Sequence, residues 1–339
     1  MTLSAFLVQL LNGLAGASSL FLVAAGLSLI FGVTRIVNFA HGSFFMLGVY
    51  IAYTLVDKLG AAIGFWPAVL LAALAVGLIG ALVEVLLLRR IYKAPELFQL
   101  LATFALVLVI KDAALWLWGA EDLLGPRAPG LAGSIDILGR RFPTYDLLLI
   151  VIGPVVLGLL WLLLTRTRWG TLVRAATQDR EMVGALGVNQ AGLFTGVFAL
   201  GALLAGLGGA LQLPREPASL NLDLLTIGDA FVVVVVGGMG SIPGAYVAAL
   251  LIAEIKAICV GIGTVHWFGV DFSFSKLTLV VEFLVMAVVL VLRPWGLMGR
   301  PQGVSRNSAP VEAPLRAADR TLKLAGAVLL VALLLLPVL

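Results

Sequence analysis

Residues 4–33 read SAFLVQLLNGLAGASSLFLVAAGLSLIFGV, an apolar stretch without a charged side chain. A helix of about 20 such residues spans the hydrocarbon core of a bilayer. Hydrophobic residues make up 61% of the chain and charged residues only 12%, a balance typical of membrane proteins. Similar runs recur near residues 37–56, 62–88, 97–118, 145–165, 191–213, 226–260, 276–292 and 321–339. The sequence therefore predicts an all-α, polytopic transmembrane helical bundle with about 8–9 spans.

The run 226–260 is interrupted by the sequence GGMGSIPG at residues 237–244. Gly and Pro gather where a chain turns or unwinds, so this run cannot form one regular helix. We expect two half-length pieces, a Gly-rich broken or re-entrant helix pair near 226–260. Irregular backbone at membrane depth is tolerated only where protein or a water-filled cavity covers it.

The basic residues of the short loops indicate the orientation of the chain, because Lys and Arg concentrate on the cytoplasmic side. One side collects Arg35, Arg89, Arg90, Lys93, the segment 165–188 and the tail from Arg293 to Lys323. We therefore expect this side to be cytoplasmic and the N-terminus to lie outside. Arg127, Arg140 and Arg141 fall on the other side, in a longer loop that also carries acidic residues.

One charged segment separates two apolar runs: residues 165–188 read TRTRWGTLVRAATQDREMVGALGV, with four arginines. A protein does not need such a segment to span the bilayer. A soluble partner that moves the membrane helices, however, needs a structured segment to bind. We interpret 166–189 as a cytoplasmic coupling segment with one helix over 174–187. Its candidate coupling residues are Arg174, Ala175, Asp179, Arg180, Glu181, Gly184 and Gly187. The alternative is that the arginines only follow the positive-inside rule; the mixed charges and small residues at helical spacing favour coupling.

The chain contains no G-x-x-x-x-G-K-[ST] motif, the loop that cradles phosphates in P-loop ATPases. We therefore expect no cofactor in this chain, so that any ATP and Mg would be bound by separate partner subunits. No H-E-x-x-H motif is present, and the one cysteine, Cys259, excludes a Cys-based metal site. We expect neither catalytic residues nor a metal site.

Two groups of residues are candidates for a substrate pathway. Gly237, Gly238 and Ser241 lie at the helix break. There, backbone amides and the Ser241 hydroxyl would bind the carboxylate of a transported solute near the midplane of the membrane. The alternative there is a tight packing turn. Asn38 and His41 begin a spanning run, where polar side chains are costly unless paired. For this second group the favoured interpretation is a plain helix start with Asn38 as the N-cap.

Charged residues inside the apolar runs need partners. We expect Glu282 to have a partner on another helix and a structural role, which is favoured over a contact with substrate. Glu254 and Lys256 are expected to satisfy each other or to line the mouth of the pathway.

Glu84 has no cation on its own helical face at the usual spacing. Arg89 and Arg90 lie nearby but are expected to point off that face, and a partner on another helix is an equal alternative. Lys111 and Asp112 lie near the outer end of a run and are expected to snorkel or to pair with neighbours.

Four motifs follow one another along the chain: GVTRIVNFAHGSFFMLG at 32–48, DREMVGALGV at 179–188, VGGMGSIPG at 236–244 and RPWGL at 293–297. Together they resemble the permease subunits of branched-chain amino-acid ABC importers, the LivH type. The match covers residues from about 5 to 300 in the family's order. The second motif departs from the general Glu-Ala-Ala-xxx-Gly importer signature, because Met182 and Val183 stand where the alanines would be.

The resemblance implies half of a heterodimeric pore in the bacterial inner (plasma) membrane that carries branched-chain amino acids, while relatives carry amides, urea and other amino acids. It implies as partners a companion LivM-type permease, two ATP-binding subunits, an extracytoplasmic substrate-binding protein and membrane lipid. Residues 1–300 would form the permease domain and 301–320 a cytoplasmic linker. Residues 321–339 would form an additional hydrophobic helix, similar to the first helix of the companion permease.

Two functions of other classes stay open. An ion-coupled secondary transporter or channel for a small polar solute would also be polytopic with a broken helix, although this chain lacks an obvious ladder of ion-binding residues. An intramembrane hydrolase would need Ser241 with His266 or His41, but Ser241 is not in a G-x-S-x-G motif. Nucleic-acid binding is not expected, because the basic residues are scattered over the loops rather than gathered on one face.

Overall fold

The computed structural model describes residues 3–92, 94–267 and 270–299. Residues 1–300 form one compact unit. The predicted linker 301–320 and the predicted helix 321–339 lie outside the described residues.

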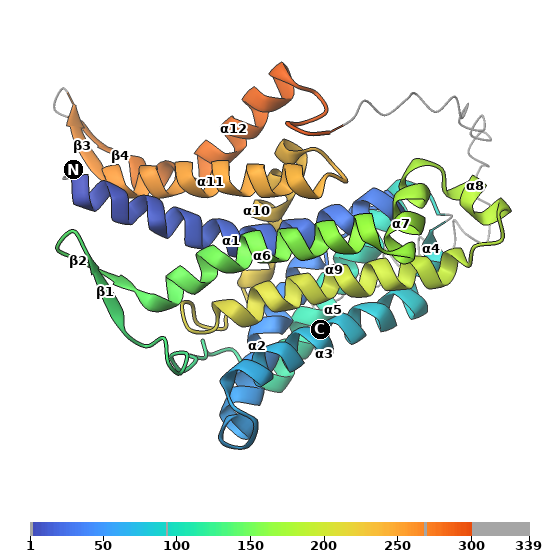
Figure 1. Ribbon diagram of the computed structural model, residues 1–339, viewed down its shortest axis with the longest axis horizontal. Helices are drawn as coiled ribbons and strands as arrows, with labels where there is room; N and C mark the ends of the chain where they lie inside the picture. Colours follow the sequence, from blue (N-terminus) through green and yellow to red (C-terminus); the bar gives the residue numbers. More distant parts are fainter. Residues whose placement is uncertain (1–2, 93, 268–269, 300–339) are drawn as a thin grey trace, which may run out of the picture. The chain divides into compact units, whose positions relative to one another are not determined.

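Helices dominate this unit (Figure 1). Within the described residues, seven helices are long and apolar enough to cross a membrane. They are α1 (Leu3–Thr34), α2 (His41–Ile63), α3 (Phe65–Val83) continued by the π-helix η1 (Glu84–Leu88) and α4 (Arg89–Ile91), α5 (Glu96–Trp118), α6 (Thr144–Arg166), α9 (Gln190–Gln212) and α11 (Ile242–Ile262). Two shorter apolar helices are α10 (Leu222–Gly237) and α12 (Thr278–Leu292), the latter preceded by the 3₁₀ turn η2 (Phe274–Leu277). The chain is a polytopic helical membrane protein, as predicted, and the exact number of spans stays a prediction.

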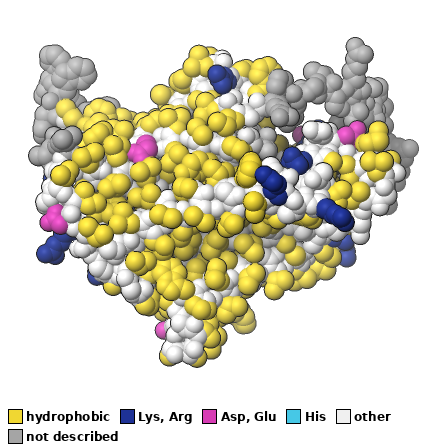
Figure 2. Space-filling view, in the orientation of Figure 1, with side chains coloured by type: hydrophobic (Ala, Val, Ile, Leu, Met, Phe, Trp, Pro, Cys, Tyr) yellow, Lys and Arg dark blue, Asp and Glu magenta, His cyan; other side chains and the backbone are white. Residues whose placement is uncertain are grey.

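The two ends of the long helices carry different structures (Figure 1). At one end lie two antiparallel hairpins, β1 (Ser134–Ile137) with β2 (Arg140–Pro143) and β3 (Thr264–Trp267) with β4 (Val270–Ser273). At the other end the short helices α7 (Arg168–Gln178) and α8 (Arg180–Ala185) connect α6 to α9. Figure 2 shows hydrophobic side chains over much of the middle of one face, with Lys and Arg mostly toward the two ends. This distribution is the one expected of a protein that lies across a bilayer.

Helix α1 packs against α6, α9, α10 and α11 along its length, and α9 in turn packs against α2 and α3. Where α2 meets α9, a Cβ on Gly48 would overlap the carbonyl oxygen of Gly206. Small residues at such crossings let two backbones approach closely, which matters in lipid because no hydrophobic effect drives helices together there. The glycine-rich composition of these helices is therefore a packing feature.

Helix α10 ends at the glycine-rich stretch, and helix α11 begins there. Gly238 and Gly240 have φ angles of +101° and +83°, a region that residues with a Cβ rarely adopt. The expectation of two half-length pieces is wrong for α11, which has 21 residues and is long enough to cross a membrane. Whether α10 enters the membrane as one arm of a re-entrant pair stays a prediction.

The segment that follows α12 covers this break. The amides of Leu297 and Met298 donate to the carbonyls of Val236 and Gly237 at 2.8 Å and 3.0 Å. A Cβ on Gly238 would overlap the backbone of this segment. The last residue of the RPWGL motif and the residue after it thus supply hydrogen bonds to the last carbonyls of α10, which would otherwise have no helical partner.

A second irregular region, which the sequence did not reveal, lies where α2 and α10 begin. The Nε2 atom of His41 lies 3.0 Å from the carbonyl oxygen of Val23, in the interior of α1. A Cβ on Gly42 would overlap the carbonyl oxygen of Asp223, so the first turns of α2 and α10 touch. Both helices therefore begin partway along the bundle, and non-helical segments lead into them.

We predict that Gly48→Ala lowers the free energy of unfolding by about 1–3 kcal/mol, the usual cost of overpacking a close contact. The matched control is Gly16→Ala in α1, where a Cβ has no neighbour within 4 Å and alanine favours the helix over glycine. Thermal unfolding of the purified protein in detergent should show a lower midpoint for Gly48→Ala only. Equal midpoints for both variants would contradict the close crossing of α2 and α9.

Candidate functional site

The segment between α6 and α9 forms two short helices, α7 and α8, rather than one. The predicted single helix over 174–187 is therefore wrong. The chain turns at Asp179, whose φ of −148° and ψ of +99° lie outside the helical range. The Oδ1 atom of Asp179 accepts the amide of Met182 at 2.9 Å. An aspartate in this N-cap position favours the start of a new helix over the continuation of the old one.

Side chains also fix the two ends of this segment. The Thr167 hydroxyl accepts the Gly170 amide at 3.0 Å where α7 begins, and Asn189 Oδ1 accepts the Gly192 amide at 3.1 Å where α9 begins. Helix α8 is followed by Gly187 with φ +82°, the conformation that favours glycine after a helix C-terminus. Residues 167–189 thus have a defined shape, and we call them the α7–α8 elbow.

The elbow is attached to three of the long helices. Gly170 packs on the backbone at the end of α6, so that α7 folds back on that helix. The indole of Trp169 lies against Gly196 of α9. A Cβ on Gly32 of α1 would lie 3.5 Å from the methyl group of Thr177. A force on the elbow would therefore act on α1, α6 and α9 together.

The elbow also exposes two large apolar side chains. Met182 is 58% exposed and Leu186 is 75% exposed. They lie four residues apart, which places them on one side of a helical turn. Val183, next to them, is buried and anchors α8. Exposed apolar side chains on a polar segment suit contact with another protein.

The predicted coupling residues divide between the exposed and the partly buried sides of the elbow. Arg174, Asp179 and Gly187 are exposed, and Ala175 and Gly184 are partly buried. A Cβ on Gly184 would overlap the side chain of Gln190. Arg180 and Glu181 lie in α8, and their side chains are outside the described set.

A buried carboxylate, Glu84, lies in η1 and links α3 to α9. Its side chain is 0% exposed, and Oε2 lies 3.0 Å from Nη2 of Arg89. The hydroxyl of Thr195 donates to Oε2 at 2.6 Å, and the hydroxyl of Tyr92 donates to Oε1 at 3.1 Å. The expectation that Arg89 points off the face of Glu84 is wrong, because a π-helical turn brings residues five apart onto one side. The alternative of a partner on another helix is also realised, by Thr195.

The glycine-rich break lies at the elbow end of the bundle. Ser241 Oγ accepts the Gly244 amide at 3.2 Å and so caps α11. A Cβ on Gly32, near the last turn of α1, would lie 3.3 Å from the Cα atom of Gly240. The break is thus beside the end of α1 and the elbow rather than midway along the bundle. This position favours the packing turn over the substrate contact for Gly237, Gly238 and Ser241.

Asn38 and His41, the second predicted group, are buried at the start of α2. Asn38 Oδ1 accepts the amide of Ala40 at 3.1 Å, and Ala40 rather than Asn38 is the residue that precedes α2. The predicted N-cap is therefore wrong by two residues, because the Asn38 side chain forms an Asx turn instead. Within the described residues, Asn38 Nδ2 and His41 Nδ1 are buried without a hydrogen-bond partner. Buried polar atoms without a partner are rare in folded proteins.

Asp223 is a residue of this interior region that sequence reasoning missed. It lies in the first turn of α10, 1% exposed, with Oδ1 3.9 Å from Nζ of Lys111 on α5. The expectation that Lys111 pairs with a neighbour is confirmed. Among the described residues, Asp223 Oδ2 and the Tyr50 hydroxyl are buried without a hydrogen-bond partner. In the sequence Asp223 stands just before an apolar run and looks like a loop residue.

Lys256 of α11 joins three helices through charge. Its Nζ lies 2.8 Å from Asp229 Oδ2 on α10 and 2.5 Å from Glu282 Oε2 on α12. The predicted interhelical partner of Glu282 is confirmed. The predicted pairing of Glu254 with Lys256 is wrong, because residues two apart on a helix do not face each other. Glu254 packs instead on Gly13 of α1.

The residues considered for hydrolysis are engaged separately. The Ser241 hydroxyl caps α11, while His41 is bonded to the carbonyl of Val23 in α1. The side chain of His266 is outside the described set. Ser241 and His41 therefore show no nucleophile–base contact.

Residues 9–290 match the family described as "Branched-chain amino acid transport system / permease component". The chain is 30% identical over 310 residues to the high-affinity branched-chain amino acid transport system permease protein BraD of Pseudomonas aeruginosa, with 88% of this chain and 97% of that protein covered. The chain belongs to this permease family. It is also 25% identical over 311 residues to the permease protein LivH of Salmonella typhimurium, with 88% and 96% covered. A probable LivH permease of Methanocaldococcus jannaschii is 28% identical over 298 residues, with 83% and 88% covered.

The family resemblance read from four motifs is thereby confirmed, and each motif has a place in the permease. Residues 32–48 form the end of α1 and the start of α2, and 179–188 form α8 with its flanking turns. Residues 236–244 form the α10–α11 break, and 293–297 cover that break. Each motif thus includes or contacts a helix break or the elbow, where the direction of the chain changes.

We predict that Arg89→Gln lowers the midpoint of thermal unfolding of the permease, because a buried carboxylate is costly without a matching charge. Glu84 would then be buried without its counter-charge. Arg90→Gln is the matched control, because Arg90 is exposed on the adjacent position. Thermal unfolding in detergent measures the difference. An Arg89→Gln midpoint equal to that of Arg90→Gln would show that the Glu84–Arg89 pair contributes nothing.

Proposed function

We propose that this permease forms half of the transmembrane pathway of an ATP-binding-cassette importer for branched-chain or related amino acids. The names of its relatives support the substrate class. Its proposed place is the bacterial inner (plasma) membrane, with the N-terminus outside and the α7–α8 elbow in the cytoplasm. The basic residues at the elbow end support this orientation.

Four kinds of partner complete the proposed machine. A companion LivM-type permease would supply the other half of the pathway, and two ATP-binding subunits would carry ATP and Mg. An extracytoplasmic binding protein would deliver the substrate. The chain itself has no phosphate-binding loop of the P-loop type, which supports its role as a transport subunit without ATPase activity of its own.

The observation that carries this proposal is the build of the α7–α8 elbow. Its turns are set by side-chain caps at Thr167, Asp179 and Asn189, which give the elbow a defined geometry. Met182 and Leu186 offer an apolar contact to an ATP-binding subunit, and Arg174 of α7 adds an exposed charge to the elbow. Because the elbow touches α1, α6 and α9, closure of the ATP-binding subunits would move these helices as one body.

Transmission beyond the elbow follows from its contacts. Thr177 lies against Gly32 of α1, and Gly32 lies against Gly240 in the α10–α11 turn. Helix α10 runs from this turn to Asp223, which contacts the start of α2 at Gly42. A shift of the elbow would thus reach the buried polar groups at the beginnings of α2 and α10, the proposed pathway.

We predict that the double variant Met182→Glu, Leu186→Glu lowers ATP-driven uptake at least tenfold, because two carboxylates replace the apolar contact. Both side chains are exposed, so folding of the permease should persist. The control is Leu124→Glu, which is 78% exposed at the hairpin end. Co-purification of the ATP-binding subunits and uptake into proteoliposomes are the measurements. Normal co-purification and normal uptake in the double variant would remove the elbow from the coupling role.

A second experiment tests the class of transporter. The permease, its companion, the ATP-binding subunits and the binding protein are reconstituted into proteoliposomes. Uptake of radiolabelled L-leucine should require ATP and should be unaffected when proton and sodium gradients are collapsed. Uptake driven by an ion gradient in the absence of ATP would instead favour the ion-coupled secondary transporter.

A further inference from the structure

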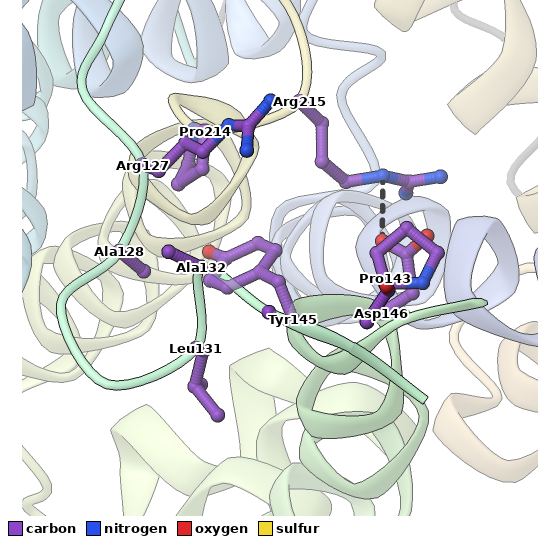
Figure 3. A pocket seen from close by; sticks show the side chains of 11 residues that line it. Arg127, Ala128, Leu131, Ala132, Pro143, Tyr145, Asp146, Pro214 and Arg215 are labelled. Carbon is purple, nitrogen blue, oxygen red and sulfur yellow. Dashed lines mark ion pairs between the residues drawn. The ribbon is translucent and has the colours of Figure 1, made fainter. Parts of the chain in front are cut away.

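A pocket lies where α6 begins (Figure 3). The start of α6 is at the hairpin end of the bundle, opposite the elbow (Figure 1). Its volume is about 520 Å³, within the range of roughly 300–1,000 Å³ that is usual for small-molecule sites. Three parts of the chain form its wall: the loop 127–134, the start of α6 and the segment that follows α9. In the proposed orientation this pocket faces the outside of the cell.

Hydrogen bonds hold the three parts of the wall together. The hydroxyl of Tyr145 donates to the carbonyl of Leu211 at the end of α9, at 2.6 Å. The hydroxyl of Thr144 donates to the carbonyl of Leu131 at 2.9 Å. These bonds join sequence-distant segments, so the pocket is present before any ligand arrives. Preformed sites lose less entropy on binding than sites that must be assembled.

The loop is tied to the segment after α9 by a further pair of backbone bonds. Leu123 and Ala218 exchange amide–carbonyl hydrogen bonds at 3.0 Å and 2.9 Å. Gly125 packs on Leu213 so closely that a Cβ there would overlap the leucine side chain. The loop therefore cannot move without the segment that leads from the pocket to α10.

The pocket wall carries opposite charges beside apolar side chains. Arg215 Nε lies 3.1 Å from Asp146 Oδ1, and the two residues come from different segments (Figure 3). The contact uses one nitrogen of the guanidinium, which has two more. Arg127 adds a second guanidinium to the wall, and Ala132 and Pro143 add apolar side chains. The side chain of Asp146 is only 8% exposed, so a charge that approaches it is little screened by water.

We propose that this pocket is an entrance site that binds a free zwitterionic amino acid with an aliphatic side chain. The guanidinium groups of Arg215 and Arg127 would bind its carboxylate, Asp146 would bind its ammonium group, and the apolar wall at Ala132 and Pro143 would receive its side chain. The proposal rests on the proposed function and adds to it a site on the permease itself. A single-charge ligand would satisfy only one side of the Arg215–Asp146 pair.

The chain connects the pocket to a second pair of opposite charges. Residues 214–221 lead from Arg215 to the first turn of α10, where Asp223 and Lys111 form a second pair of opposite charges. A zwitterion that leaves the pocket along this segment would therefore meet the same chemistry again in the interior.

The test uses the complete complex of permease, companion and ATP-binding subunits in nanodiscs, without the binding protein. Binding of tritiated L-leucine is measured by scintillation proximity. Wild type should bind L-leucine, and at equal concentration isopentylamine, which lacks the carboxylate, and 4-methylpentanoate, which lacks the ammonium group, should compete at least tenfold less well. Competition by either analogue as strong as that of unlabelled L-leucine would overturn the proposal.

Variants assign the binding to the pocket. Arg215→Gln and Asp146→Asn should each weaken L-leucine binding tenfold or more, which corresponds to about 1.4 kcal/mol or more. Arg140→Gln is the matched control, since Arg140 is an exposed arginine of β2 that is not part of the pocket wall. Ala132→Trp fills the pocket without removing a charge, and it too should abolish binding. Unchanged binding in Ala132→Trp would overturn the proposal even if the charge variants fail to fold.

Uptake by the full system, with binding protein and ATP, separates this inference from the proposed function. Normal ATP-driven uptake by wild type together with unchanged L-leucine binding in folded Arg215→Gln would overturn the entrance site and leave the function intact. A wild-type complex that neither imports nor binds any amino acid would overturn both.

Discussion

The close approach of other helices to α1 is the constraint on which the rest of the structure depends. Gly13 accommodates Glu254 of α11, Gly26 lies against Gly201 of α9, and Gly32 lies against the α10–α11 turn. In lipid the hydrophobic effect does not drive helices together, so steric fit of this kind must determine which helices pack against each other and in what register. Because α1 has no charged side chain of its own within 4–33, it can be enclosed by its neighbours without any cost for buried charge.

Ion pairs and hydrogen bonds to charged side chains then fix the relative positions of helices that steric fit alone defines less well. Carboxylates within a membrane are costly unless matched, and two groups of charged residues match carboxylates between helices, whereas Glu254 Oε2 is buried without a hydrogen-bond partner among the described residues. Glu84 ties α3 to α9 through Thr195 as well as to Arg89. Lys256 ties α10, α11 and α12. These interior charges thus contribute to the position of the helices, and a change at one of them would alter the packing.

The sequence predicts the regular parts of this fold well and its irregular parts poorly. Apolar runs mark the long helices because length and composition alone decide whether a segment crosses a bilayer. The glycine-rich break is visible because Gly and Pro act locally. The π-helical turn at Glu84 and the chain turn at Asp179 are not visible, since each is decided by a tertiary contact or by a single cap. Asp223 escapes notice for the same reason: only the meeting of α2 with α10 places it in the interior.

The same distinction explains why the candidate site was only partly found. Asn38 and His41 stand out as polar residues at the start of an apolar run, and the structure buries both. Ser241 stands out equally, yet its hydroxyl is used to cap α11 beside the elbow. The two groups differ in their position along α1. His41 lies against Val23, in the interior of that helix, whereas Gly240, next to Ser241, lies against Gly32 near the last turn of α1. That position depends on how far each helix start is drawn into the bundle, which is a property of the packed helices and has no local sequence signature. The glycine-rich turn thus belongs to the elbow end of the bundle, and the starts of α2 and α10 belong to its interior.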